Sequence, residues 1–113
     1  MDITFADKKL KKIVSDERAI VRVLGKIRAE KMMERMHQLR DAITLEDVRY
    51  LPGNYHELTG DRKGQWACDL DQPYRLVFEP QDKPIPVNEH GQYIWVKIIG
   101  VEIIEIVNYH KEK

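Results

Sequence analysis

The fold is decided by residues 66–78, which read WACDLDQPYRLVF. Apolar side chains stand at every second position on either side of a central turn, and they are Trp66, Cys68, Leu70, Tyr74, Leu76 and Phe78. This alternation is typical of strands with one buried face. Pro73 occupies a turn position at which no backbone donor is required. The stretch therefore predicts two paired strands joined by a turn at residues 71–73.

Downstream of this pair the sequence predicts a loop and then more sheet. Residues 81–92 contain Pro84, Pro86 and Gly91, which indicates a long solvent-exposed loop. Residues 94–109 are rich in Ile and Val and are interrupted by Gly100, so we expect strand pieces that meet there at a bend or bulge.

Upstream, the sequence predicts a short strand at residues 3–5 and then helices. Asp7 is a suitable N-cap for a helix that begins near Lys8, and Ser15-Asp16 either lies within this helix or splits it. Gly25 is expected to end the segment, because glycine readily adopts the left-handed conformation found at helix ends.

A more regular helix is predicted after Gly25. Its apolar positions recur at intervals of three and four and are Ala29, Met32, Met36, Leu39 and Ile43. Residues 44–47 resemble a capping box that begins one further helical turn. The expected fold class is α+β, with an N-terminal helical hairpin packed on one face of a small, mainly antiparallel sheet of three or four strands after a short first strand.

Composition limits the class of protein. The 113 residues suit a single domain spanning 1–113 that folds without disulfides or metals. Nineteen basic residues balance nineteen acidic ones, so any contact with RNA must come from a local patch. The one cysteine, Cys68, has no partner at metal-ligand spacing, and no metal or cofactor is expected. Without an apolar leader or a membrane-length segment, we expect a cytoplasmic protein with no membrane partner.

Three stretches taken together resemble the HigB-like branch of the RelE/ParE toxin superfamily. They are residues 56–66 (HELTGDRKGQW), 73–79 (PYRLVFE) and 103–110 (IIEIVNYH). The resemblance implies a RelE-like (microbial RNase-like) fold with a concave site on the open sheet face. It also implies cleavage of mRNA on the ribosome and neutralisation by a helix-turn-helix antitoxin (HigA-like). Operator DNA would be contacted only through that antitoxin.

Cleavage of RNA without a metal needs a base for the 2′-hydroxyl, cations for the charge on phosphorus and an acid for the departing oxygen. His110 can exchange protons near neutral pH, although it is also close to the chain end. Arg75, in an otherwise apolar strand, requires a partner. This partner is either a substrate phosphate or a carboxylate such as Glu79. The resemblance places a catalytic arginine at Arg75.

The sequence also suggests a local patch of cationic side chains. Arg62 and Lys63, at a predicted turn, could combine with Arg75 to bind phosphates, or they could simply be solvated. His56 is a candidate for a second proton-transfer group or an RNA-stacking ring. Its alternative is a structural histidine bound to a backbone carbonyl.

The C-terminal residues complete the candidate site. Tyr109 could stack on a base, and strand alternation predicts that it lies on the opposite face from Asn108 and His110. Asn108 is a further catalytic candidate and stands where many members of the resembled family carry an aspartate. Its amide can orient a histidine or hydrogen-bond RNA but cannot act as a carboxylate base. Thr59 stands where such members may carry a lysine. Both departures weaken the inference of catalysis and leave the fold untouched.

The leading hypothesis is therefore a metal-independent, ribosome-dependent mRNA endoribonuclease that inhibits translation as the toxin of a type II toxin-antitoxin system. A gyrase inhibitor of the ParE type is the first alternative, although that action needs no proton-transfer histidines. The second alternative is an RNA-binding relative that does not cut, which Asn108 leaves open.

Overall fold

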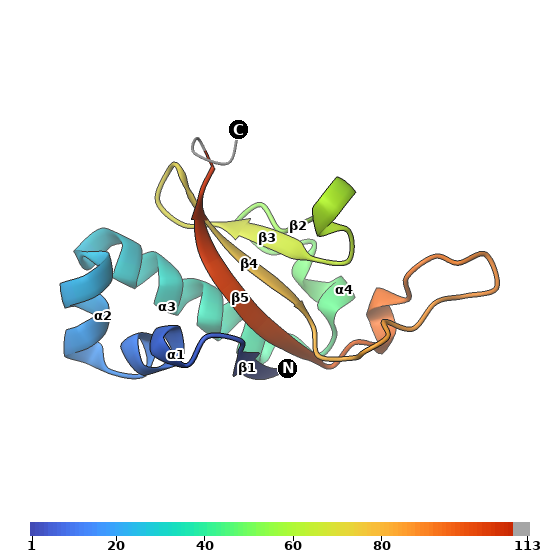
Figure 1. Cartoon of the computed structure of the whole chain (residues 1–113), viewed down its shortest axis with the longest axis horizontal. Coiled ribbons are helices and arrows are strands. Elements are labelled where there is room, and N and C mark those ends of the chain that lie inside the picture. The colour runs from blue at the N-terminus through green and yellow to red at the C-terminus, as the bar shows by residue number, and fades with distance from the viewer. Residues whose placement is uncertain (110–113) are drawn as a thin grey trace.

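The computed structural model describes residues 1–109 as an α+β fold with a mixed sheet of five strands (Figure 1). The α-helices are α1 (Lys8–Val14), α2 (Glu17–Leu24), α3 (Lys26–Asp41) and α4 (Leu45–Val48). The strands are β1 (Asp2–Phe5), β2 (His56–Glu57), β3 (Trp66–Asp69), β4 (Tyr74–Pro80) and β5 (Gly100–Asn108). Two short 3₁₀ helices, η1 (Gly60–Arg62) and η2 (Trp95–Lys97), lie in the connections.

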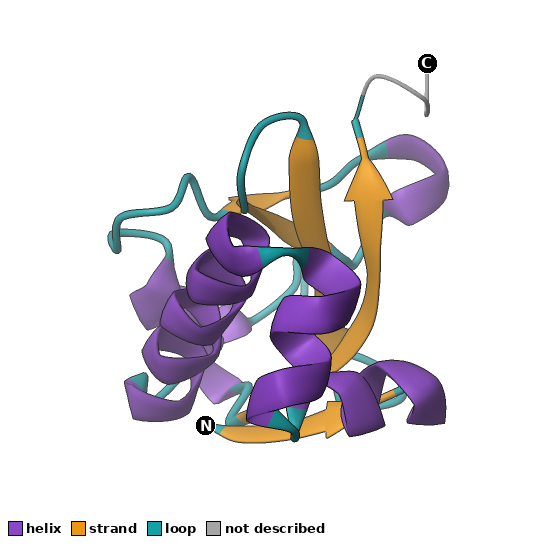
Figure 2. Ribbon diagram, turned by 90° about the vertical axis from the view of Figure 1, so that its left-hand side faces the viewer, coloured by secondary structure: helices purple, strands orange, loops and turns teal. Residues whose placement is uncertain are grey.

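The strands lie in the order β1-β5-β4-β3-β2. Strands β2 to β5 pair antiparallel, as the sequence predicts for the region after the helices. Strand β1 adds a parallel edge beside β5. The helices cover one face of this sheet (Figure 2). We call this the core face and the other the open face.

Local capping explains why the helical segment before Gly25 is divided in two, which is one of the two alternatives that the sequence left open. Asp7 accepts a hydrogen bond from the backbone N–H of Lys9 (2.8 Å) and caps α1. Asp16 accepts one from the N–H of Arg18 (2.8 Å) and starts α2, so the chain is split at Ser15-Asp16. Gly25, with φ of +83°, ends α2 as expected.

Helix α3 supplies the helical side of the core. Ala29, Met32, Met36 and Leu39 are buried, as their spacing predicts. The expectation for Ile43 was wrong, because α3 ends at Asp41 and this side chain is 78% exposed. The chain turns away at Ala42, whose backbone is extended. The predicted capping box is present, with the N–H of Thr44 donating to Asp47 (3.0 Å).

The segment before β5 also differs from expectation. Residues 95–97 form η2, and β5 begins at Gly100 and runs as one strand, so two strand pieces do not meet at that glycine. A side chain at Gly100 would collide with Gln81, whose amide donates to Asp2, Thr4 and the carbonyl of Val101. The register does shift, but further along, opposite Val77 and Phe78.

Residues 87–93 form a hairpin that projects from the body of the molecule (Figure 1). The two ends of this hairpin are joined by an antiparallel β-bridge between Val87 and Tyr93. The expectation of an exposed loop is thus confirmed at the tip, where residues 88–92 are exposed. None of the helices within residues 1–109 is long and apolar enough to span a membrane.

Candidate functional site

The open face is organised by the strand register. One row across the sheet pairs His56 with Ala67, Ala67 with Val77 and Val77 with Glu105. The next row pairs Asp69 with Arg75 and Arg75 with Val107. Successive side chains on a strand point to opposite faces, so these two rows share the face away from Leu76 and Phe78.

A small apolar cluster forms the floor of the open face. Ala67, Val77 and Val107 are buried in it, and Leu58 and Ile104 pack against it. Charged side chains surround this floor. An apolar floor lowers the local dielectric, and interactions between charges beside it are stronger than in bulk water.

Arg75 lies between a carboxylate and an aromatic ring. Its Nε is 3.3 Å from Oδ1 of Asp69, and its guanidinium carbon is 4.1 Å from the ring centroid of Tyr109. Both members of the ion pair are largely buried, with exposed fractions of 22% and 23%. Glu79, the carboxylate suggested by the sequence, instead accepts a hydrogen bond from Gln65 (3.0 Å) and pairs with Lys83.

The backbone of Asp69 is held by hydrogen bonds from the core side of the sheet. Buried Arg35 on α3 donates from Nε to the backbone carbonyl of Asp69 (2.7 Å) and from Nη1 to that of Pro52 (3.3 Å). The N–H of Asp69 donates to the carbonyl of Gly53 (2.8 Å). A methyl group at Gly53, where φ is +123°, would lie 2.7 Å from Cζ of Arg35. The position of Arg75 is therefore connected to the core through Asp69 and Arg35.

Sequence reasoning missed these supporting residues. A signal for Asp69 was present, because a turn at residues 71–73 places position 69 opposite position 75. The signal for Arg35 was weaker: an arginine lies beside Met32 and Met36 in the helical pattern. The same position in the sequence is equally compatible with a solvent-exposed arginine.

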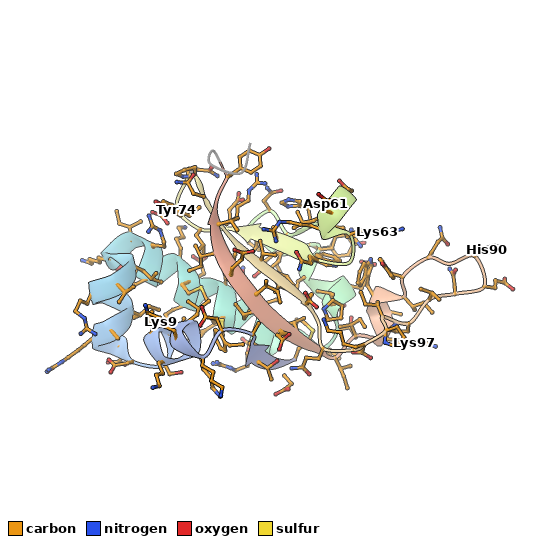
Figure 3. All side chains as sticks on the ribbon, in the orientation of Figure 1. Lys9, Asp61, Lys63, Tyr74, His90 and Lys97 are labelled. Atoms are coloured by element: carbon orange, nitrogen blue, oxygen red, sulfur yellow. The ribbon has the colours of Figure 1, made fainter. Side chains whose placement is uncertain are left out.

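Arg62 and Lys63 lie on different surfaces. Arg62 reaches the open face, where Nη2 is 3.0 Å from Glu105 and Nη1 donates to Gln65 (3.0 Å). Lys63 instead points toward the side of the 87–93 hairpin, with Nζ 5.8 Å from the ring centroid of Tyr93 (Figure 3). The structure thus brings Arg62 to the face of Arg75 and places Lys63 elsewhere.

His56 lies on the open face with a defined orientation. Its Nδ1 is 2.7 Å from the backbone carbonyl oxygen of Asn54. A carbonyl can only accept, so Nδ1 carries the proton and Nε2 of the neutral ring is a proton acceptor. The carbonyl contact foreseen as the structural alternative is present.

The C-terminal residues separate as strand alternation predicts. Tyr109 contacts Arg75, whereas Asn108 is paired with Tyr74, a residue of the core face covered by Arg28. Asn108 is therefore not brought to Arg75. His110, the candidate for proton transfer, lies outside the described residues.

Two hollows lie away from this cluster. One, of about 680 Å³, is a mainly apolar groove among α1, α2, α3 and β1. The other, of about 660 Å³, lies between η1, β2 and the 87–93 hairpin, and Lys63 lines it. Arg75 lines neither of these two.

We also considered a cysteine nucleophile, a tyrosine hydroxyl and a metal site as alternative sources of reactivity. Burial raises the pKa of the Cys68 thiol to about 12, so it is a poor nucleophile at neutral pH. Burial also raises the pKa of Tyr55, whose hydroxyl donates to Gln38 (2.8 Å). Within residues 1–109, no three His, Cys, Asp or Glu side chains are grouped to hold a metal ion.

Comparisons of the chain with models of known families, with curated proteins and with solved structures found no match. Functional inference therefore depends on the residues themselves and on their geometry.

Proposed function

We propose that this protein is a RelE-like toxin of the HigB-like branch that cleaves mRNA on the ribosome without a metal, and that a helix-turn-helix antitoxin neutralises it. The observation that carries the proposal is the arrangement of Arg75. It is held by Asp69 and Tyr109 on the same sheet face as His56 and Arg62.

The architecture supports this proposal. Helices cover the core face (Figure 2). The opposite face has cationic and aromatic groups around an apolar floor. RNA-cleaving sites without metals need cations and proton-transfer groups on one accessible surface. We infer the RelE-like arrangement of the fold from this combination and from the motifs in residues 56–66 and 73–79.

The proposed reaction is attack of the ribose 2′-oxygen on the adjacent phosphorus. The new bond joins the 2′-oxygen to phosphorus, and the bond from phosphorus to the 5′-oxygen of the next nucleotide breaks. Nε2 of His56 is oriented to take the 2′-hydroxyl proton, and His110 is the candidate acid for the 5′-oxygen. The products are a 2′,3′-cyclic phosphate and a 5′-hydroxyl.

Arg75 is assigned to the phosphate. A guanidinium carries five N–H donors, so a carboxylate at Nε does not exhaust its binding capacity. The carboxylate of Asp69 and the ring of Tyr109 hold the group on the open face before substrate arrives, which favours stabilisation of the charge that develops on phosphorus. Tyr109 presents its ring beside this group and is assigned to stacking on an unpaired base.

The test is mRNA cleavage in a translating extract, with 5′ ends mapped for the wild type and for Arg75→Ala and His110→Ala. Arg18→Ala is the matched control, because Arg18 is an exposed arginine on α2. Cuts within codons that need ribosomes and disappear in the first two variants are expected. Intact mRNA in the presence of folded wild-type protein would refute the nuclease.

One observation favours a second candidate, an RNA-binding protein that does not cut. Arg75 already has a carboxylate partner, and Asn108 lies on the other face. Ribosome binding with intact mRNA would select this function. Intact mRNA without ribosome binding would direct the search to gyrase inhibition.

A further inference from the structure

The hollow beside the 87–93 hairpin lies outside the proposed reaction site. It is lined by Glu57, Lys63, Asn88, His90, Gly91, Gln92, Tyr93 and Trp95. These residues come from β2, the end of η1, the hairpin and the start of η2. In Figure 3, Lys63 extends from η1 toward the side on which the hairpin carries His90. We call this site the aromatic hollow.

One wall of the aromatic hollow is a row of contacting aromatic rings that begins in the core. The ring centroids of Tyr93 and Trp95 are 5.0 Å apart, and Trp95 meets Trp66 edge to face at 5.4 Å. Trp66 is fully buried and Trp95 is 7% exposed, whereas Tyr93 is only partly buried. The wall is therefore rigid behind an accessible ring, which suits a planar, apolar ligand.

Lys63 supplies a cationic side chain to the lining of the aromatic hollow. Glu57 is the acidic residue of the lining, and its carboxylate is 2.9 Å from Nη2 of Arg49, a guanidinium that it shares with Glu46. Nζ of Lys63 lies near the face of Tyr93, at 5.8 Å from the ring centroid. His90 lies at the hairpin tip next to Glu89, with 3.5 Å between Nε2 and Oε1. Lys63 can therefore pair with an anionic group of a ligand that lies against Tyr93.

The hairpin is organised before any ligand binds. Oδ1 of Asn88 accepts hydrogen bonds from the N–H groups of His90 (2.8 Å) and Gln92 (3.0 Å). At its base the hairpin segment packs on Gly64, where an added Cβ would lie 3.1 Å from Ile85 and 3.6 Å from the Tyr93 hydroxyl. A preformed hollow binds its ligand with a smaller loss of conformational entropy.

We propose that the aromatic hollow binds one unpaired nucleotide of RNA, with the base on Tyr93 and the phosphate on Lys63. The choice of RNA rests on the proposed function. Arg62 pairs with Glu105 on the open sheet surface, whereas Lys63, the next residue, lines the hollow, so the two surfaces adjoin at the end of η1. A strand bound at Arg75 and Arg62 can therefore continue around η1 into the hollow, where it adds a contact beyond the cleaved bond.

The first test is titration of the full chain with AMP, followed by the indole N–H signal of Trp95 in a ¹H–¹⁵N spectrum. We expect a saturable shift of this signal at millimolar AMP. Lys63→Gln should weaken AMP binding about fivefold and leave adenosine binding unchanged, because only AMP has the phosphate. Tyr93→Leu should weaken both ligands about tenfold, since it removes the stacking surface.

Lys97→Gln is the matched control, because Lys97 is an exposed lysine on η2 and is not among the lining residues. Lys63→Gln changes an exposed side chain, so it tests the hollow even if Tyr93→Leu disturbs the hairpin. An unmoved Trp95 signal at about 10 mM AMP would overturn the proposal. Equal AMP binding by wild type and Lys63→Gln would also overturn it.

The two experiments distinguish failure of the nuclease proposal from failure of the nucleotide-binding proposal. AMP binding with no cleavage in the translating extract would reject the nuclease and keep the nucleotide site. Cleavage that requires Arg75, together with no AMP binding, would reject the hollow alone. In the Arg75→Ala variant, AMP should still shift the Trp95 signal.

Discussion

The two faces of β4 differ in the kind of side chain that they present and in how deeply it is buried. On the core face, Leu76 and Phe78 are completely buried among apolar side chains. On the open face, Val77 contributes to a small apolar floor and Arg75 joins a charged and aromatic group. The core face supplies stability through area removed from water, whereas the open face presents chemistry through cross-strand pairs. Mutations on the two faces should therefore separate stability from activity.

The largest effect on stability is expected on the core face. Phe78→Ala should reduce the free energy of unfolding by about 3–5 kcal/mol, because it leaves a cavity where the ring meets Tyr55. Val77→Ala, one residue away on the open face, should cost about half as much, because it removes fewer buried carbons. Urea unfolding followed by tryptophan fluorescence measures both. Equal losses would mean that the open face is packed like a second core.

The second effect concerns activity. Arg75→Gln should slow cleavage about 10²–10³-fold, since it removes charge stabilisation worth about 3–4 kcal/mol in the transition state. Its cost in stability should be about 1–3 kcal/mol, because it leaves the largely buried carboxylate of Asp69 without its charged partner. Arg75→Lys should recover only part of the rate, because lysine lacks the planar fork. A rate unchanged in Arg75→Gln would remove this residue from the reaction.

Periodicity in the sequence predicts which strand residues face the core. It does not predict the contacts made by the segments that connect the strands. Trp66 and Phe78 could be assigned to the core because strands repeat every second residue. The same reasoning misread residues 94–98, where Trp95 and Ile98 reach the core at a spacing of three, through η2. The contact of Lys63 with Tyr93 joins segments separated by strands β3 and β4 and the loop that follows them, and no local pattern encodes it.

A third experiment examines the connection between the faces. Arg35→Met should reduce the free energy of unfolding by about 2 kcal/mol, because the carbonyl groups of Asp69 and Pro52 lose a buried charged donor. If Arg35 also positions Asp69, cleavage by the folded variant should slow while binding of mRNA is retained. Comparison of the rate and the KM for mRNA at a temperature where the variant is folded checks this. An unchanged rate would show that the core supports the site only through stability.

The smallest effect is expected away from both faces, at the start of α2. Hydrogen bonds from the N–H groups of Ala19 and Arg18 lower the pKa of Asp16 below its ordinary value of 3.8. A carboxyl with a lowered pKa stabilises the fold above 3.8 and loses this contribution as the pH falls through the folded value. Asp16→Ala should therefore lower the Tm slightly at pH 7, and this difference should shrink when both proteins are melted below pH 3.8. A difference that stays constant with pH would show that the cap acts through helix propensity and not through the charged carboxylate.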